Sequence, residues 1–246
     1  MTHDLFRNDA YLRQCEATVL AVTPDGVVLD RTVFYPLGGG QAGDSGVLLL
    51  ADGRSLAIAD TRKAKDAEGR PTDAIWHVPA PGQDALLAAL QPGQPAAARI
   101  DWDRRHRLMR FHTTTHLLCH LVPQLVNGCS ITPEYARLDF NMTDPLDKDV
   151  LTAGIARLVA AAHPVAVGAI SDEELEANPS LVRSMSVQPP RGTGRVRTIR
   201  IGADTAVDYQ PCGGTHVANT AEIGNVVVTK IEKKSATTRR VVLGFA

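Results

Sequence analysis

Aromatic residues are scarce in this chain and make up 4% of its 246 residues. Platforms of stacked aromatic side chains, which bind single-stranded nucleic acids, are therefore not an evident feature. No stretch approaches the roughly 18 apolar residues of a membrane-spanning helix. The N-terminus, MTHDLFRNDAY, also lacks the apolar run of a secretory signal peptide. These absences predict a protein of the cytoplasm with no membrane partner.

The chain has no large excess of positive or negative charge, and it contains few cysteines. The formal net charge of -1 gives no global case for a nucleic-acid partner, although local patches matter more than the sum. The four cysteines do not show the spacing of a disulfide framework, which fits a reducing compartment. Apolar residues make up 44% of the chain, enough for a buried core and too many for a disordered protein.

The first part of the chain has the pattern of a small β-domain. Residues 16–60 contain the short runs EATVLAV, GVVLD, TVFYPL and GVLLL, separated by turn signals such as Asp52-Gly53, and AIWHV follows at 74–78. Many short strands with glycine-rich turns predict a small barrel or sandwich. A short helix is expected at 83–90. The proline-containing segment QPGQPAAA (91–98) then suggests a boundary, which gives domains 1–95 and 96–246.

The second part mixes helices with strands and predicts an α+β fold. One helix is expected from Asp103 through RRHRLMRFHTTTHLLCHLVPQL, with Pro123 as a break. Another is expected at 147–162, with Asp144 or Asp147 as its N-cap and Pro164 beyond its end. The segments PVAVGAI, VRTIRI, NVVVTKIEKK and RRVVLGFA have the composition of strands.

Two separated elements predict one metal site. His112 and His116 are four residues apart in a helix, which puts both imidazoles on one face. Alone, this pair is as readily explained by two helix-surface histidines. The second element, Cys212-Gly-Gly-Thr-His216, pairs two preferred zinc donors across glycines that permit a tight turn. Together they predict one zinc ion per chain. His120 is excluded, because its Cα lies about 12 Å along the helix from that of His112.

Three segments carry a resemblance to a known family. RLMRFHTTTHLL (107–118) and QPCGGTHVANTAEIG (210–224) resemble the editing domain of alanyl-tRNA synthetases and of the free-standing AlaX proteins. Threonyl-tRNA synthetase carries a similar domain. The upstream FYPLGGGQAGDSG (34–46) resembles the glycine-rich motif of the synthetases and of the longer AlaX type. The resemblance implies a β-barrel similar to elongation-factor domain II, followed by an α+β editing domain whose zinc ligands are His112, His116, Cys212 and His216.

The resemblance also implies a reaction, the hydrolysis of the ester that joins serine, or glycine, to tRNA(Ala). Because nothing before the barrel-like half could house ATP-dependent aminoacylation, we expect a separate deacylase. Serine differs from alanine by one hydroxyl, which a pocket with a hydrogen-bond partner can distinguish. Thr132 is the favoured partner. The other candidates are Thr113, Thr114, Thr115 and Ser130.

Further site residues are predicted from the glycine-rich and basic segments. Gly38, Gly39 and Gly40 let the backbone approach a ligand closely, and Gln41 is predicted to orient a water or contact the terminal adenosine. Asp208 is a candidate to orient His216 by accepting a hydrogen bond from the ring nitrogen that does not bind the metal. Three clusters of basic residues, at 99–110, 183–200 and 230–240, are candidates for acceptor-stem binding. Arg191 and Arg195, in the loop QPPRGTGR, suit a phosphate clamp best.

Three other functions fit the same residues less well. One is an editor of threonyl-tRNA synthetase errors. Another is a non-catalytic tRNA-binding module in which zinc only stabilises the fold. The third, an unrelated zinc hydrolase, would lack the glutamate of an H-E-x-x-H motif and so has no evident general base.

Overall fold

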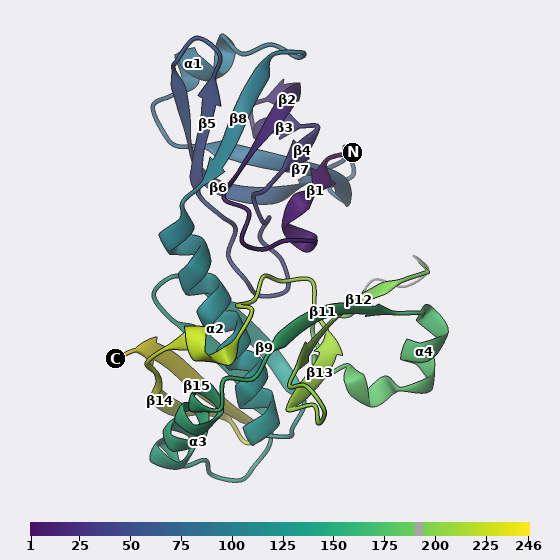
Figure 1. The fold of residues 1–246 in the computed structure, drawn as a ribbon, viewed down its shortest axis with the longest axis vertical. Coiled ribbons are helices and arrows are strands. Elements are labelled where there is room, and N and C mark those ends of the chain that lie inside the picture. The colour runs from purple at the N-terminus through teal and green to yellow at the C-terminus, as the bar shows by residue number, and fades with distance from the viewer. Residues whose placement is uncertain (190–193) are drawn as a thin grey trace. The chain divides into compact units, whose positions relative to one another are not determined.

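The computed structural model describes residues 1–189 and 194–246, so the predicted phosphate ligand Arg191 lies outside the described residues. The chain divides into two compact units (Figure 1). The first comprises residues 1–38 and 42–106, and the second comprises residues 39–41 and 107–246. The predicted boundary at 95/96 lies too early, because residues 95–100 form a strand that pairs on both sides within the first unit.

The first unit is a β-structure with one short α-helix. Its elements are β1 (His3–Asp4), a 3-10 turn (Leu5–Arg7), β2 (Gln14–Thr23), β3 (Gly26–Leu29), β4 (Arg31–Thr32), β5 (Gly46–Leu50), β6 (Ser55–Lys65), β7 (Pro71–Pro79), α1 (Asp84–Ala88) and β8 (Pro95–Ile100). Six strands form a closed barrel in the order β2-β3-β7-β6-β5-β8, and β1 pairs with β4 beside it. The predicted strand TVFYPL forms only in part, since β4 ends at Thr32. The likeness to elongation-factor domain II stays a prediction.

Alternating side chains fill the barrel. Leu56 and Ile58 of β6 are buried, as are Leu29 of β3 and Leu48 of β5. Burying one such side chain contributes about 1.5–3 kcal/mol. Strand β8 has the same alternation but uses small residues, with Ala96, Ala98 and Ile100 buried. Because of its alanines and the prolines around it, this strand could not be recognised in the sequence.

A buried ion pair holds the chain on both sides of the glycine-rich segment. The side chains of Asp44 and Arg105 are both fully buried and form a salt bridge. The Asp44 carboxylate also accepts a hydrogen bond from the backbone nitrogen of Tyr35 at 2.6 Å, and Arg105 donates to the carbonyl of Val33 at 2.7 Å. The first unit therefore fixes residues 33–35 and residue 44, between which the segment 38–41 runs.

Helix α2 (Trp102–Leu121) carries the histidine pair. It contributes residues 102–106 to the first unit and 107–121 to the second. Between Leu108 and Cys119 every side chain except Arg110 is buried. Three consecutive threonines, which are poor helix formers, lie in this stretch, and their hydroxyls bond to the carbonyls of residues 109, 110 and 112. The helix ends two residues before Pro123, as the restriction on pre-proline residues favours.

The second unit combines two antiparallel sheets with helices. Its further elements are β9 (Val126–Ile131), β10 (Ala136–Asn141), α3 (Lys148–Ala160), β11 (Val165–Ile170), α4 (Asp172–Ala177), β12 (Val196–Ile201), β13 (Asp208–Pro211), β14 (Val226–Ser235), β15 (Thr238–Phe245) and the 3-10 turns Pro179–Leu181 and Thr220–Ile223. The sheets have the orders β14-β15-β10-β9 and β11-β12-β13. Helix α3 packs against β14, and its predicted N-cap Asp147 is confirmed. None of the helices within the described ranges is long and apolar enough to cross a membrane.

Candidate metal centre

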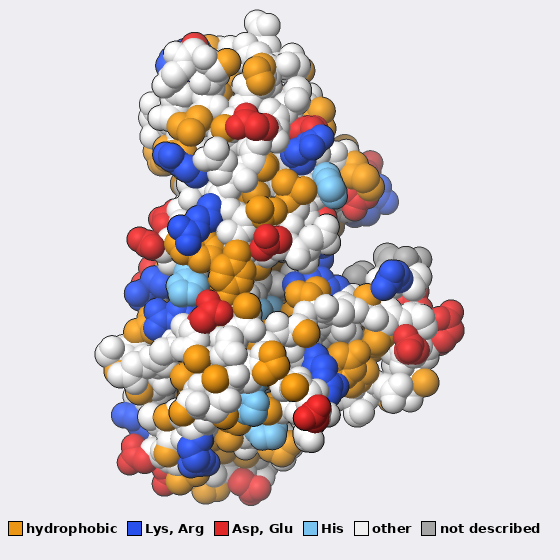
Figure 2. Space-filling model, viewed as in Figure 1, with side chains coloured by type: hydrophobic (Ala, Val, Ile, Leu, Met, Phe, Trp, Pro, Cys, Tyr) orange, Lys and Arg blue, Asp and Glu red, His pale blue; other side chains and the backbone are white. Residues whose placement is uncertain are grey.

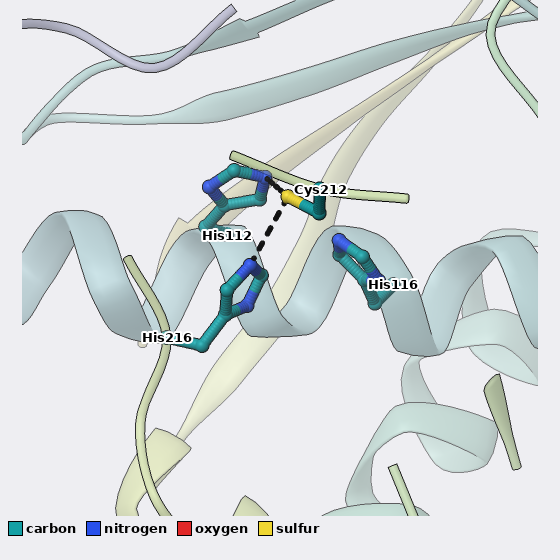
Figure 3. A group of neighbouring side chains, drawn as sticks. All are labelled: His112, His116, Cys212 and His216. Carbon is teal, nitrogen blue, oxygen red and sulfur yellow. Dashed lines mark hydrogen bonds between the residues drawn. The ribbon is translucent and has the colours of Figure 1, made fainter. Parts of the chain in front are cut away.

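Four side chains from two distant segments converge at one point of the second unit (Figure 3). His112 and His116 project from one face of α2, and Cys212 and His216 lie on the turn that follows β13. One potential ligand atom from each residue lies within 4.8 Å of the other three. Cys212 Sγ is 3.4 Å from His112 Nε2 and 3.3 Å from His216 Nε2. The structure thus brings together all four predicted ligands, and His120 is exposed on the same helix.

The two distances from Cys212 Sγ fit a tetrahedral metal ion. Bond lengths of about 2.3 Å to sulfur and about 2.0 Å to nitrogen place adjacent sulfur and nitrogen ligands roughly 3.5 Å apart in tetrahedral geometry. The distances from Cys212 Sγ to His112 Nε2 and to His216 Nε2 are close to that value. Three imidazoles also lie ring against ring, with centroids 4.3 Å apart for His112 and His216 and 4.7 Å apart for His116 and His216. Buried bases at such distances are best satisfied by a shared cation.

Each histidine is held through its other ring nitrogen. His112 Nδ1 lies 2.7 Å from Gln41 Oε1, and His116 Nδ1 lies 2.7 Å from Asp208 Oδ2. His216 Nδ1 lies 3.2 Å from Thr113 Oγ1. In all three cases the Nδ1–H donates outward, which directs Nε2 towards the point that the four side chains share.

The Thr113 hydroxyl fixes the tautomer of His216 through its own hydrogen bonds. Its only proton goes to the carbonyl of Met109 at 2.9 Å. Its oxygen can therefore only accept from His216 Nδ1 and from the backbone nitrogen of Val217. The sequence suggested Asp208 as the partner of His216, whereas the structure pairs this carboxylate with His116.

The electrostatics of the cluster favour a thiolate. Burial opposes charge on Cys212, but His112 and His216 outweigh it and hold the pKa of the thiol well below its ordinary value. Burial likewise opposes charge on His116, yet hydrogen bonds to Asp208 and Cys212 raise its pKa to about 10. Burial and the neighbouring His112 lower the pKa of His216 well below the ordinary range. Because thiolate is the ligating form of cysteine, the lowered pKa of Cys212 favours metal binding, whereas His116 has to lose its Nε2 proton before that nitrogen can bind an ion.

The glycine-rich segment delivers Gln41 into this cluster. Gly39 and Gly40 have φ values of 57° and 87°, a backbone conformation that favours glycine. A Cβ on Gly40 would lie 3.0 Å from three atoms of Cys129. Gln41 itself is fully buried. Besides His112, its Oε1 accepts from Thr215 N at 3.1 Å, and its Nε2 donates to Thr215 Oγ1 at 2.9 Å.

The predicted role of Gln41 in orienting a water or contacting adenosine stays a prediction. Both ends of its amide are bonded to protein groups, so they favour a role in positioning His112. Gly38 belongs to the first unit, where its carbonyl accepts a hydrogen bond from the Tyr35 hydroxyl.

The candidate partners for a substrate hydroxyl are placed differently from one another. The hydroxyls of residues 113–115 are directed to helix carbonyls. Ser130 is paired with Arg137 in the register of β9 and β10. Thr132 directly follows Ile131, whose backbone bridges to Gln41. Its hydroxyl caps its own turn, accepting from Glu134 N and Tyr135 N and donating to the carbonyl of Tyr135.

Many of the predicted phosphate-binding arginines have partners within the protein. Arg107 donates to the carbonyl of Pro133, Arg110 to that of Ile223 and Arg200 to that of Ala203. Arg240 forms a salt bridge with Asp139. On the face shown in Figure 2, Lys and Arg side chains of the described residues are interspersed with Asp and Glu. The role of the three basic clusters in acceptor-stem binding stays a prediction.

Comparison with known proteins places the chain in a family. Residues 196–242 match the model of the threonyl and alanyl tRNA synthetase second additional domain, and residues 8–78 match that of class II (A) tRNA synthetases. The chain is 34% identical over 94% of its length to a quarter (25%) of the alanine–tRNA ligase of Metallosphaera sedula. It is 31% identical to the alanyl-tRNA editing protein AlaX-M of Saccharolobus solfataricus, over 98% of both chains. The AlaX-M of Methanosarcina barkeri is 33% identical over 98% of this chain and 97% of its own. With this identity across nearly the whole of both chains, the protein belongs to the alanyl-tRNA editing protein family.

Proposed function

We propose that this chain is a zinc-dependent hydrolase that cleaves the ester of Ser-tRNA(Ala) and spares Ala-tRNA(Ala). The observation that carries the proposal is the buried convergence of Cys212 with three histidines, each held through Nδ1 by its own partner. The editing function in the names of the full-length relatives supports it. A zinc ion bound there would act as a Lewis acid on the ester or lower the pKa of a water towards 7.

The residues of the chain prepare this chemistry before substrate arrives. The pKa of the Cys212 thiol lies well below its ordinary value, and His112 and His216 direct Nε2 towards its sulfur. Gln41 acts through His112, not on the substrate. Three histidines and one cysteine would give a zinc ion four protein ligands. The ester or a water would then bind it as an additional ligand or in exchange for one of them, or the ion would only shape the pocket.

Selection of serine is proposed to lie with Thr132. To select serine, the Thr132 hydroxyl would exchange one of its hydrogen bonds within the turn for a bond to the serine hydroxyl, which alanine does not offer. The backbone bridge between Ile131 and Gln41 supports this choice, because it ties the adjoining residue to the metal cluster. Thr132→Val should therefore slow hydrolysis of Ser-tRNA(Ala) and narrow the preference for it over Gly-tRNA(Ala).

Contact with tRNA is proposed for Arg191 and for Arg195, which is exposed just before β12. Replacing both with alanine should weaken tRNA binding and lower the slope of log affinity against log salt by about 2 if each contacts one phosphate. Fluorescence titration of uncharged tRNA(Ala) at several salt concentrations measures the slope. An unchanged slope would argue against this loop as the clamp.

The deciding experiment compares hydrolysis of Ser-tRNA(Ala) and Ala-tRNA(Ala), with and without a chelator. We expect rapid loss of serine only, abolished by chelation and restored by Zn²⁺. Cys212→Ser should lose the activity, whereas Cys15→Ser, at a thiol in β2 of the first unit, should keep it.

Two other outcomes would indicate the alternative functions. A folded, zinc-loaded wild type without hydrolysis would favour the tRNA-binding module. The domain model that matches here is shared by threonyl and alanyl synthetases. Faster cleavage of Ser-tRNA(Thr) than of Ser-tRNA(Ala) would therefore identify an editor of threonyl-tRNA synthetase errors.

A further inference from the structure

An arginine from a neighbouring strand holds the turn that carries two of the four ligands. Arg197 lies in β12, and its backbone oxygen accepts a hydrogen bond from Cys212 N at 3.2 Å. Its guanidinium nitrogen Nη1 donates to Cys212 O at 2.6 Å and to Gly214 O at 3.0 Å. One residue therefore makes three hydrogen bonds to the turn.

The turn needs such support because its sequence gives it little rigidity. Its centre is Gly213-Gly214, and glycine loses more conformational freedom on folding than any other residue. The carbonyls of Cys212 and Gly214 both approach the same nitrogen, an arrangement that is repulsive without a cation between them. Charge-assisted hydrogen bonds of this kind are shorter and stronger than neutral ones.

The position of the turn sets the metal ligands directly. Gly214 packs so closely on His112 that a Cβ there would lie 2.1 Å from His112 Cε1. Cys212, whose carbonyl Arg197 binds, contributes the only sulfur of the cluster. A small shift of the backbone would therefore move Sγ and release the His112 ring together.

We propose that Arg197 is a positioning residue of the metal centre. By bridging the carbonyls of Cys212 and Gly214, it fixes the turn in the conformation that directs Cys212 Sγ and His216 Nε2 towards the ion. This inference rests on the metal-binding part of the proposed function and is independent of ester hydrolysis.

Arg197 also belongs to the basic cluster predicted to bind tRNA, and the two roles have different consequences. If Arg197 bound a phosphate, Arg197→Met would weaken tRNA binding and reduce its salt dependence while metal affinity stayed the same. If Arg197 positions the turn, Arg197→Met lowers metal affinity and leaves the salt dependence of tRNA binding unchanged.

The test uses Co²⁺ alone as the probe. Its affinity is measured by competition with a chelating dye, and its visible absorption reports the ligand geometry. We expect Arg197→Met to bind Co²⁺ about 10–100-fold more weakly, the usual effect of losing a residue that supports metal ligands, with an altered spectrum. Arg197→Lys keeps a charged donor on a side chain one bond shorter and should recover part of the affinity.

Arg200→Met is the matched control. Arg200 lies in the same strand, but its guanidinium donates to the carbonyls of Ala203 and Asp204, so wild-type affinity is expected. If Arg197→Met fails to fold, the lysine variant decides. Wild-type affinity and spectrum in Arg197→Met would overturn this inference alone. A wild type that binds no Co²⁺ would overturn the metal centre and this inference together.

Discussion

At the scale of single residues, Gly214 is required by space and not by backbone angle. A Cβ at this position would lie 2.4 Å from His112 Nδ1 and 2.9 Å from Gln41 Oε1. Both belong to the hydrogen bond that orients His112. Gly214→Ala must therefore displace either the imidazole or the turn.

We predict that Gly214→Ala lowers Zn²⁺ affinity at least 10-fold and destabilises the fold by about 1–3 kcal/mol through overpacking. Metal competition and urea unfolding measure the two effects. Gly38→Ala is the matched control, because the nearest atoms to its Cβ would be 3.7 Å away. Equal affinities in the two variants would contradict the close packing of the turn on His112.

His77 gives the first unit a pH dependence of its own. Its ring is fully buried, with Nδ1 3.0 Å from the carbonyl of Val27 and Nε2 2.7 Å from Thr32 Oγ1. Burial lowers the pKa of His77 to about 4, against the opposing effect of the Val27 hydrogen bond. An unfolded chain takes up this proton near pH 6.5. Between those pH values the unfolded state therefore binds more protons than the folded state.

The free energy of unfolding should consequently fall as the pH is lowered from 6.5 to 4, with a contribution from His77 of up to about 3 kcal/mol. Urea unfolding of wild type and of His77→Gln across this range measures it. The variant is less stable near neutrality but should show a flatter pH dependence. His120→Gln, at an exposed histidine of α2, serves as control and should keep the wild-type slope. Parallel curves for His77→Gln and wild type would refute the assignment.

At the scale of elements, α3 ends in an unfavourable conformation. Ala162, two residues beyond the last helical residue, has a φ of 52°, and it is the only non-glycine with positive φ in the described ranges. A Cβ in this left-handed conformation costs about 1–2 kcal/mol in the folded state. Glycine removes that cost, but its greater conformational entropy stabilises the unfolded state by about 0.4–1 kcal/mol. Ala162→Gly should therefore stabilise the protein by about 0.5 kcal/mol.

Ala161→Gly is the control for this prediction, because Ala161 has a helical φ of -69°. Glycine at a helical φ should destabilise by about 0.5–1 kcal/mol. Thermal unfolding of the two variants should thus shift in opposite directions. A shift in the same direction for both would mean that the left-handed angle carries no cost.

Elements with a strong periodic or capping signal could be predicted from the sequence, and those built on small residues could not. The long helix and the Asp147 cap follow from local rules. Strand β8 was missed because its alanines resemble a linker. Strand β9, VNGCSI, was missed because its glycine and polar residues obscure the alternation.

The same limit applies to the metal centre. Spacing and donor type suffice to group the four ligands, since both are local properties. The groups that form hydrogen bonds with Nδ1 of the ligand histidines depend on how the strands pack against α2. Hence Asp208 was matched to the wrong histidine, and the role of Thr113 depends on a proton that it gives to its own helix.

At the scale of the whole molecule, the metal ligands and their partners all belong to the second unit. This holds even for Gln41, although Gly38 and Ala42, which flank the segment 39–41, belong to the first unit. The ligands His112 and Cys212 are also far apart along the chain, so a bound ion would cross-link α2 to the turn after β13. Metal binding should therefore stabilise the second unit in particular.

We predict that chelation lowers the stability of the zinc-loaded protein by about 3 kcal/mol when free Zn²⁺ was at 100 times its dissociation constant. Hydrogen exchange followed by mass spectrometry should show faster exchange in 107–121 and 208–217, and little change in β3 and β7 around His77. Cys212→Ser should not respond to the chelator. Equal acceleration in the barrel strands would show that the ion stabilises both units as one cooperative structure, because only a global unfolding step exposes both sets of amides together.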